Sequence, residues 1–218
     1  MVNEPEAITA AQFHAHPGVD DWRVTSWGPQ ACFRTSSLQE AARLTDAIVA
    51  AATRLRLDPD IDLRPEAVVV RIPRNDWVIP RESARLAAAI SESARDLGIR
   101  SDPGLIQTVD IFVAQHVDID TRPFCMAALG YVALGDTDAV DPLRRGPALA
   151  CNSVMEKAGR GRTHVDIHVP ADQAEARVAA ALAAGGRLVD DSRAPMWWTV
   201  ASPDNHGVDI ASWTDTDS

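Results

Sequence analysis

The chain has 218 residues and a formal net charge of −10, so it lacks the excess of Lys and Arg on which non-specific nucleic-acid binding depends. No apolar run reaches the roughly 20 residues of a membrane-spanning helix, and the acidic first six residues disfavour a secretory signal. The three cysteines, Cys32, Cys125 and Cys151, are odd in number and far apart, which is typical of a reducing compartment. We therefore expect a cytoplasmic protein of one large or two small domains that contacts neither nucleic acid nor membrane.

The first half of the chain is expected to alternate helices with strands in the order α-β-β-α-β-β-α. The capping box Ser37-Leu38-Gln39-Glu40 opens a long amphipathic helix over 38–55. A second long helix is expected to start at Pro80 and to close at Gly98. The remaining expected elements are a helix at 8–14 and strands at 22–26, 31–34, 61–63 and 67–72, with the first two strands joined by a turn at Gly28-Pro29. The stretch 100–104 resembles a linker, so we predict domains at 1–102 and 105–218.

The second half contains an internal repeat. Residues 108–113 (TVDIFV) resemble residues 164–169 (HVDIHV), and each segment precedes an expected helix that ends in glycine, at 122–130 and at 171–185. Further strands are expected at 148–154, 197–201 and 208–213. The pattern predicts two similar βαβββ units side by side, and the whole chain is predicted to have an α+β fold.

Alternation along these strands predicts one unusually polar face. If His164 faces a cavity, Asp166 and His168 do so too, because side chains of a strand alternate between its faces. The same rule adds Asp110 and Asp209 to that face. The cluster is expected either to bind a cationic or hydroxyl-rich small ligand or an ion, or to form a satisfied hydrogen-bond network. One member of the pair Trp197-Trp198 is expected to face inward, where it could stack on a ligand, unless both belong to the core.

Residues 7–98 resemble the pterin-4a-carbinolamine dehydratases. The resemblance is carried by Trp22, the Cys32-Phe33-Arg34 strand, the turn over 58–61, the 68–70 strand and the helix containing Leu86-Ala87. It implies an active site with a His-His-Pro turn, a later histidine and an acidic residue, which would move protons as water leaves. At the five corresponding positions this chain has Leu57, Asp58, Pro59, Arg74 and Ser83. It therefore departs from the pattern at all but one of them. Only the proline remains, so the resemblance implies the fold with a degenerate active site.

Residues 105–213 resemble the vicinal-oxygen-chelate superfamily, which includes glyoxalase-like and bleomycin resistance-like proteins. The resemblance is carried by the segments 123–124 with 128–131, 162–166, 184–189 and 202–207. It implies four metal-ligand positions, which fall at Thr108, at Cys151 or Asn152, at His164 and at Gly207. Only His164 is a plausible ligand, and useful metal sites need three or more protein ligands. We therefore expect no metal centre of the usual kind and assign no cofactor.

These observations leave three functions open. The first is a small-molecule-binding protein that uses the polar face of the glyoxalase-like domain. The second is an enzyme, either a lyase of the pterin dehydratase type, with Asp58 as a substitute base, or a metal-dependent glyoxalase or dioxygenase using His164 with Asp166 or Asp209. The third is a dimeric interaction module, and both resemblances imply self-association.

Overall fold

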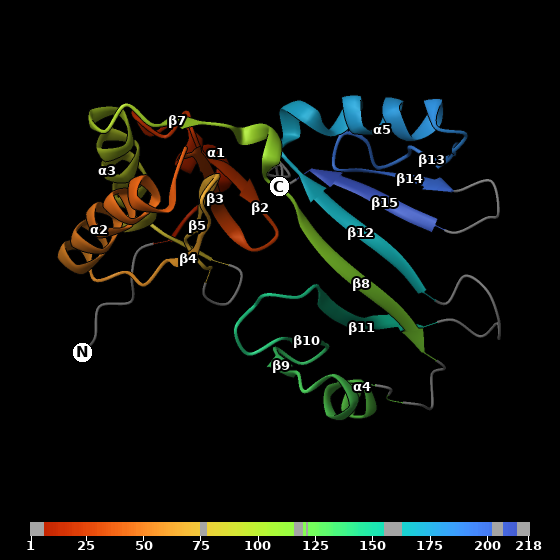
Figure 1. Ribbon diagram of the computed structural model, residues 1–218. Coiled ribbons are helices and arrows are strands. Elements are labelled where there is room, and N and C mark those ends of the chain that lie inside the picture. The colour runs from red at the N-terminus through yellow and green to blue at the C-terminus, as the bar shows by residue number, and fades with distance from the viewer. Residues whose placement is uncertain are drawn as a thin grey trace. The chain divides into compact units, whose positions relative to one another are not determined.

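The computed structural model describes residues 7–74, 78–115, 120, 122–154, 163–201 and 207–212 (Figure 1). These residues form a mixed α+β structure of two compact units, one that ends at Ile106 and one that spans Gln107–Ser212. Among the described residues, no helix is both long enough and apolar enough to cross a membrane.

The first unit packs its long helices on an antiparallel sheet. Its main elements are α1 (Ala10–His14), β2 (Arg23–Thr25), β3 (Gly28–Arg34), α2 (Leu38–Leu55), β4 (Asp60–Leu63), β5 (Ala67–Arg71) and α3 (Glu82–Asp96). Three two-residue strands add to them: β1 (Ala7–Ile8), β6 (Ile79–Pro80) and β7 (Arg100–Ser101). The sheet order is β2-β3-β5-β4, and β7 pairs with β3 on a separate branch. Because α2 and α3 are amphipathic, they bury one apolar stripe each, and the core contains Trp22, Phe33, Leu44 and Ile90.

Several local predictions for this unit are confirmed and others are wrong. Helix α2 has the predicted bounds, Ser37 accepts a hydrogen bond from the Glu40 amide, and Gly98 follows α3 with a φ of +73°. The turn predicted at Gly28-Pro29 lies two residues earlier, at Ser26-Trp27, because Gly28 and Pro29 both belong to β3. At Gly28 φ is +110° and a Cβ would come within 2.4 Å of the Ile72 carbonyl oxygen, so glycine is required for close backbone approach rather than for a turn. Pro80 belongs to β6, and α3 starts at Glu82.

The stretch predicted as a linker is packed structure. Residues 100 and 101 pair with Arg34 and Phe33 of β3, and the amide of Asp102 donates to the Cys32 carbonyl oxygen over 2.8 Å. A 3₁₀ turn, η1 (Pro103–Leu105), follows and brings Ile106 against Cys32 and Ala67. The contact pattern therefore divides the chain after Ile106.

The second unit is built from two βαβββ repeats, which confirms the repeat predicted for this half. The first repeat contains β8 (Thr108–Gln115), α4 (Arg122–Leu129), β9 (Val132–Leu134), β10 (Asp138–Val140) and β11 (Ala148–Val154). The second contains β12 (Thr163–Val169), a 3₁₀ turn η2 (Ala171–Gln173), α5 (Ala174–Ala183), β13 (Arg187–Asp190), β14 (Trp197–Ala201) and β15 (Gly207–Ser212). The eight strands lie in the order β13-β14-β15-β12-β8-β11-β10-β9. The first strands of the repeats, β8 and β12, are antiparallel neighbours at the centre, and each runs parallel to the last strand of its own repeat.

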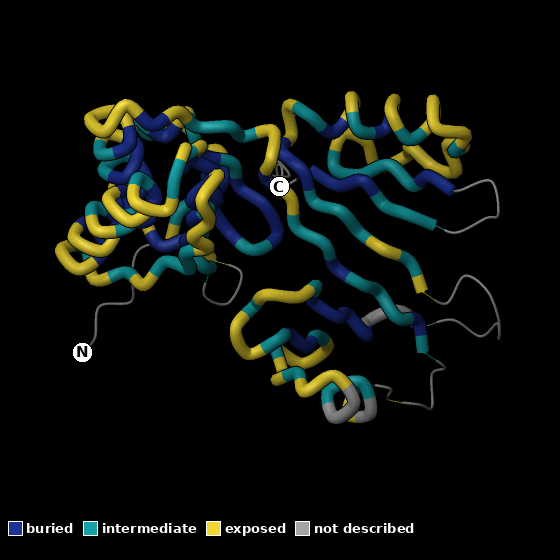
Figure 2. Tube along the Cα trace, in the orientation of Figure 1, coloured by how far each residue is buried: buried dark blue, intermediate teal, exposed yellow. Residues whose placement is uncertain are grey.

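Both helices of the second unit pack on the same face of its sheet. Ile167 of β12 packs with the core cluster that contains Val178 of α5, and Ile111 of β8 packs with the cluster that adjoins Met126 of α4. Ile111 lies opposite Val165, two residues from Ile167, so these side chains share one face. The alternate residues of β8, β12, β15 and β14 form the opposite face, which we call the polar face. Neither helix covers it, and Figure 2 shows β8 and β12 mostly at intermediate burial.

Candidate functional site

A row of carboxylates crosses the centre of the polar face. In the register of the sheet, Asp110 of β8 lies opposite Asp166 of β12, and Asp166 lies opposite Asp209 of β15. Asp209 in turn lies opposite Thr199 of β14, and Asp190 pairs with Thr199 at the rim. Like charges directly opposite each other destabilise a sheet. Acidic residues that are adjacent in register are therefore expected to need a compensating positive charge.

His164 lies between two of these carboxylates. Its Nε2 is 3.2 Å from Oδ1 of Asp166 and 3.6 Å from Oδ2 of Asp209. The short contact with Asp166 raises the pKa of His164, with a smaller contribution from the charge of Asp209, while partial burial acts in the opposite direction. Nε2 of His164 and one oxygen from each carboxylate all lie within 4.8 Å of one another. The structure thus adds two oxygen donors to the one ligand that the sequence made plausible.

The two carboxylates of this cluster are largely shielded from solvent. The side chain of Asp166 is 14% exposed and that of Asp209 is 19% exposed. The contact between Asp166 and His164 has the distance of an ion pair without the alignment of a hydrogen bond. Oδ1 of Asp166 is buried and accepts no hydrogen bond from a described residue. Burial, followed by the charge of Asp166, raises the pKa of Asp209, although a hydrogen bond with Thr199 and the nearby His164 lower it.

A second imidazole–carboxylate pair joins β12 to its other neighbour, β8. Nε2 of His168 is 3.1 Å from Oδ2 of Asp110, and both side chains are nearly buried. Nδ1 of His168 is also buried and has no hydrogen-bond partner among the residues that the structure describes. Only one carboxylate contacts His168 in the described chain, so this pair offers fewer donors than the cluster around His164.

Two neighbours fix the position of the His164 ring. Phe112, directly opposite on β8, stacks on it with ring centroids 5.1 Å apart and an interplanar angle of 19°. On β15, a Cβ at Gly207 would lie 3.6 Å from the Cβ of His164, an ordinary van der Waals distance, so the Gly207 backbone lies close beside the base of this side chain. The aromatic contact restricts the ring while its Nε2 remains directed at the carboxylates.

The tryptophan pair divides between the two faces. Trp197 lies opposite Ala211, which lies opposite His168, and this register places Trp197 on the polar face. The guanidinium of Arg193 lies 5.7 Å from the centre of its ring. Trp198 instead packs against the core cluster beneath α5. One tryptophan therefore faces the candidate site, as expected from alternation, and the register identifies it as Trp197.

The other ligand positions implied by the resemblance lie in different environments. Cys151 is buried in the cluster beside Tyr131, on the helix-covered face, and burial is the main cause that raises the pKa of its thiol. The side chain of Asn152 lies outside the described part of the chain. Thr108 lies opposite His168, and Gly207 has no side chain.

Two further carboxylates border the polar face, although the sequence did not predict them there. Asp138 of β10 lies opposite Ala150, the neighbour of Phe112. Burial, followed in the same direction by the charge of Asp110, raises the pKa of Asp138 against a hydrogen bond with Thr137. Asp190 ends β13. Both strands are too short to show a period of two, so the sequence carries no signal for them.

The residues at the degenerate dehydratase positions of the first unit lie in different environments. Asp58 is exposed, Leu57 packs partly against the core, and Pro59 is half-buried. The guanidinium of Arg74 donates to the Ser26 carbonyl oxygen. Ser83 is fully buried in the first turn of α3, and its hydroxyl has no partner among the described residues. These environments are those of turn and packing residues.

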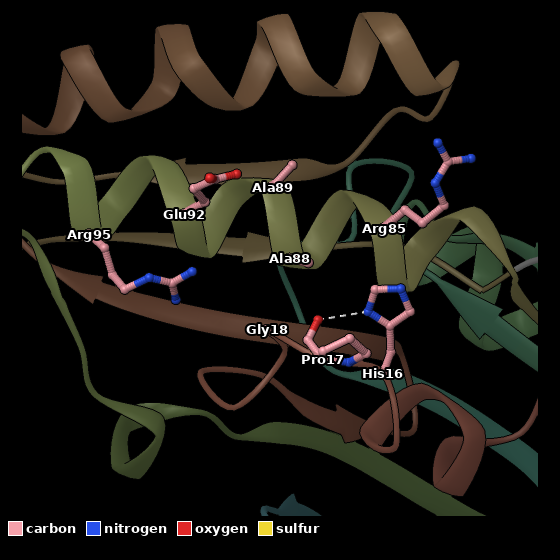
Figure 3. A pocket seen from close by; sticks show the side chains of 8 residues that line it. All are labelled: His16, Pro17, Gly18, Arg85, Ala88, Ala89, Glu92 and Arg95. Atoms are coloured by element: carbon pink, nitrogen blue, oxygen red, sulfur yellow. Dashed lines mark hydrogen bonds between the residues drawn. The ribbon is translucent and has the colours of Figure 1, made fainter.

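A hollow of about 530 Å³ lies on the surface of the first unit, between the loop 16–18 and α3 (Figure 3). Its basic side chains already have partners. Arg85 pairs with Glu82 at 2.7 Å, Arg95 lies 3.9 Å from Asp21, and the His16 ring bonds to the Pro17 carbonyl oxygen. In Figure 3 the two arginines extend from separate ends of the helix segment and do not converge. We therefore place the candidate site on the polar face of the second unit.

The known proteins that resemble this chain do so over about half of its length. No curated protein matches the chain. Two solved structures are similar to half of it, and each is covered along its full length: an NAD-dependent benzaldehyde dehydrogenase from Legionella pneumophila (13% identity, TM-score 0.35) and a glyoxalase/bleomycin resistance protein/dioxygenase superfamily member from Vibrio splendidus 12B01 (14% identity, TM-score 0.35). Residues 111–211, nearly the whole of the second unit, match the family model of the glyoxalase-like domain, so this half of the chain is similar to that family.

Proposed function

We propose that the second unit binds a small molecule on its polar face, and that the ligand carries positive charge or several hydroxyl groups. The observation that carries this proposal is the row of registered carboxylates, Asp110, Asp166 and Asp209, on a face that neither helix covers. A cation or a set of hydroxyl donors would supply what the row lacks, because His164 and His168 are the only imidazoles in contact with it among the described residues.

Trp197 adds an apolar, electron-rich surface beside the row. A tryptophan face binds planar groups by stacking and cations through its quadrupole, with about 0.5–2 kcal/mol per contact. Arg193 already occupies this kind of position near the ring. An organic cation with a hydrophobic portion would therefore satisfy both the carboxylates and the tryptophan.

Isothermal titration of the full chain against a panel of amines, quaternary ammonium compounds and polyols tests this function. We expect at least one class to bind, and we expect Asp166→Asn and Trp197→Ala each to weaken that binding about tenfold. Asp191→Asn and Trp27→Ala serve as controls that remove the same groups outside the polar face and should leave the affinity unchanged. Absence of binding across the panel, or equal binding by all four variants, would contradict the proposal.

For the first unit we propose a pterin-dehydratase-like fold that supports self-association and has lost its chemistry. Its support is the order α1-β2-β3-α2-β4-β5-α3 together with the loss of both histidines at Leu57 and Asp58 and of the third at Arg74. Asp58 is exposed in the turn after α2, and a solvated turn aspartate is more typical of a cap or turn residue than of a general base.

The purified chain should therefore not dehydrate a 4a-hydroxytetrahydropterin faster than the uncatalysed rate. Ultraviolet absorbance measures this reaction. Size-exclusion chromatography with light scattering should show an oligomer. Turnover that disappears in Asp58→Asn but persists in Asp62→Asn would instead establish the lyase activity.

A further inference from the structure

We propose that His164, Asp166 and Asp209 form a three-donor site for one divalent transition-metal ion. This inference rests on the proposed use of the polar face for binding and names an inorganic ligand for it. The site draws on two parallel strands, with His164 and Asp166 on β12 and Asp209 on β15. Of the ligand positions that the resemblance implies, it uses only His164.

The spacing of the donors fits a single ion. Two donors bonded to a metal at about 2.1 Å lie about 3.0 Å apart at a right angle and about 3.4 Å apart at a tetrahedral angle. Nε2 of His164 lies 3.2 Å from the Asp166 oxygen and 3.6 Å from the Asp209 oxygen. The third donor–donor separation falls within the 4.8 Å that encloses the group, so small side-chain rotations bring all three atoms to one ion.

Charge and hydrogen bonding favour an ion over an internal salt bridge. Two carboxylates and a neutral imidazole carry a net charge of −2, which a divalent cation balances and a protonated His164 does not. Oδ1 of Asp166, the carboxylate oxygen 3.2 Å from Nε2 of His164, is also buried and accepts no hydrogen bond from the described residues. A buried acceptor without a hydrogen bond is unfavourable, and coordination of an ion would give that oxygen a closer partner.

The donor types indicate which ions fit. One imidazole and two carboxylates suit Zn²⁺, Co²⁺, Mn²⁺ or Fe²⁺, whereas Ca²⁺ and Mg²⁺ prefer oxygen donors alone. Three protein donors leave coordination positions for water or for oxygens of a second ligand. Phe112 restricts the imidazole by stacking at 5.1 Å, which preorganises one of the three donors.

Titration of the chelator-treated full chain with Zn²⁺ and with Co²⁺ tests the site. We expect one ion per chain by calorimetry and cobalt visible absorption bands of a site with one imidazole ligand. Asp166→Asn and Asp209→Asn should each weaken binding at least tenfold, because asparagine keeps the shape of the side chain and removes the charge. Asp110→Asn is the matched control: it removes a similarly buried carboxylate from the same row and should change affinity less than about threefold.

Several outcomes overturn the metal site. Absence of stoichiometric binding does so, and so does binding that Asp110→Asn weakens as much as Asp209→Asn, because the row would then act as a diffuse negative surface. If organic cations still bind when the metals do not, the proposed function stands and only the metal site fails. If neither metals nor organic ligands bind, both proposals fail.

Discussion

Replacing Trp22 with alanine should lower the free energy of unfolding of the first unit by about 3–5 kcal/mol. Trp22 is fully buried, and its indole N–H donates to the Ala87 carbonyl oxygen and the Ser91 hydroxyl, both over 3.1 Å. Its ring also meets Phe33 edge to face, with centroids 6.4 Å apart. The substitution leaves a cavity between α3 and the sheet and removes the donor that joins them. For a unit of ordinary stability, about 5–15 kcal/mol, this loss is a large fraction of the total.

Trp27→Ala is the matched control for this prediction. Trp27 is half-exposed, and the guanidinium of Arg71 lies 5.5 Å from its ring, so its removal should cost about 1 kcal/mol or less. Urea denaturation followed by circular dichroism measures the difference, and hydrogen exchange of the α3 amides assigns it to the first unit. Equal destabilisation by the two substitutions would contradict the packing described for Trp22.

Periodicity and capping explain what could be predicted of the fold. The 3.6-residue pattern over 38–55 and the polar residue Ser37 gave the bounds of α2, because a buried stripe and a side-chain cap are both local features. The strand 148–154 was likewise predicted with the bounds of β11. The errors at Gly28 and Pro80 have a tertiary cause. The Ile72 carbonyl oxygen lies close to Gly28, and Pro80 pairs with Ala7 of β1. Local turn propensity cannot report contacts between residues so far apart in sequence.

Alternation predicted the membership of the polar face but not its geometry. It placed His164, Asp166 and His168 together because the period of a strand is two. Which tryptophan joins them depends on the register between β14 and β15, and a shift of one residue would exchange Trp197 for Trp198. The pairing of Asp110 directly opposite Asp166 likewise follows from the register of β8 and β12. Distances between the side chains depend on register and rotamers, which no single strand encodes.

Replacing Asp209 with asparagine should make the metal-free protein more stable at pH 7, by about 1 kcal/mol. The carboxylate lies opposite Asp166 in the β12–β15 pair. Burial and the charge of Asp166 raise the pKa of Asp209 in spite of its contacts with Thr199 and His164. Ionised Asp209 therefore destabilises the folded state, and asparagine keeps an oxygen that can accept from Thr199 without that charge.

The pH dependence follows from the direction of this pKa shift. Because the folded state holds the Asp209 proton more tightly than the unfolded state, wild-type stability is lost as the pH rises from about 4 through the folded pKa. The advantage of asparagine should thus be largest at neutral pH. It should narrow as the pH falls through about 4, because the carboxyl group then becomes protonated in the unfolded state as well as in the folded state. Urea denaturation of both proteins across this range measures the difference.

Asp191→Asn is the control for this stability gain, because it removes an exposed carboxylate of the same unit and should change the free energy of unfolding by less than about 0.5 kcal/mol. A variant Asp209→Asn that is less stable than wild type at pH 7 would show that the contacts with Thr199 and His164 outweigh burial. With the expected sign, the same substitution stabilises the metal-free protein and weakens metal binding. Substitution of a charge that is retained for ligand binding is expected to raise stability and weaken binding. Substitution of a residue that is retained for the fold would lower both stability and binding.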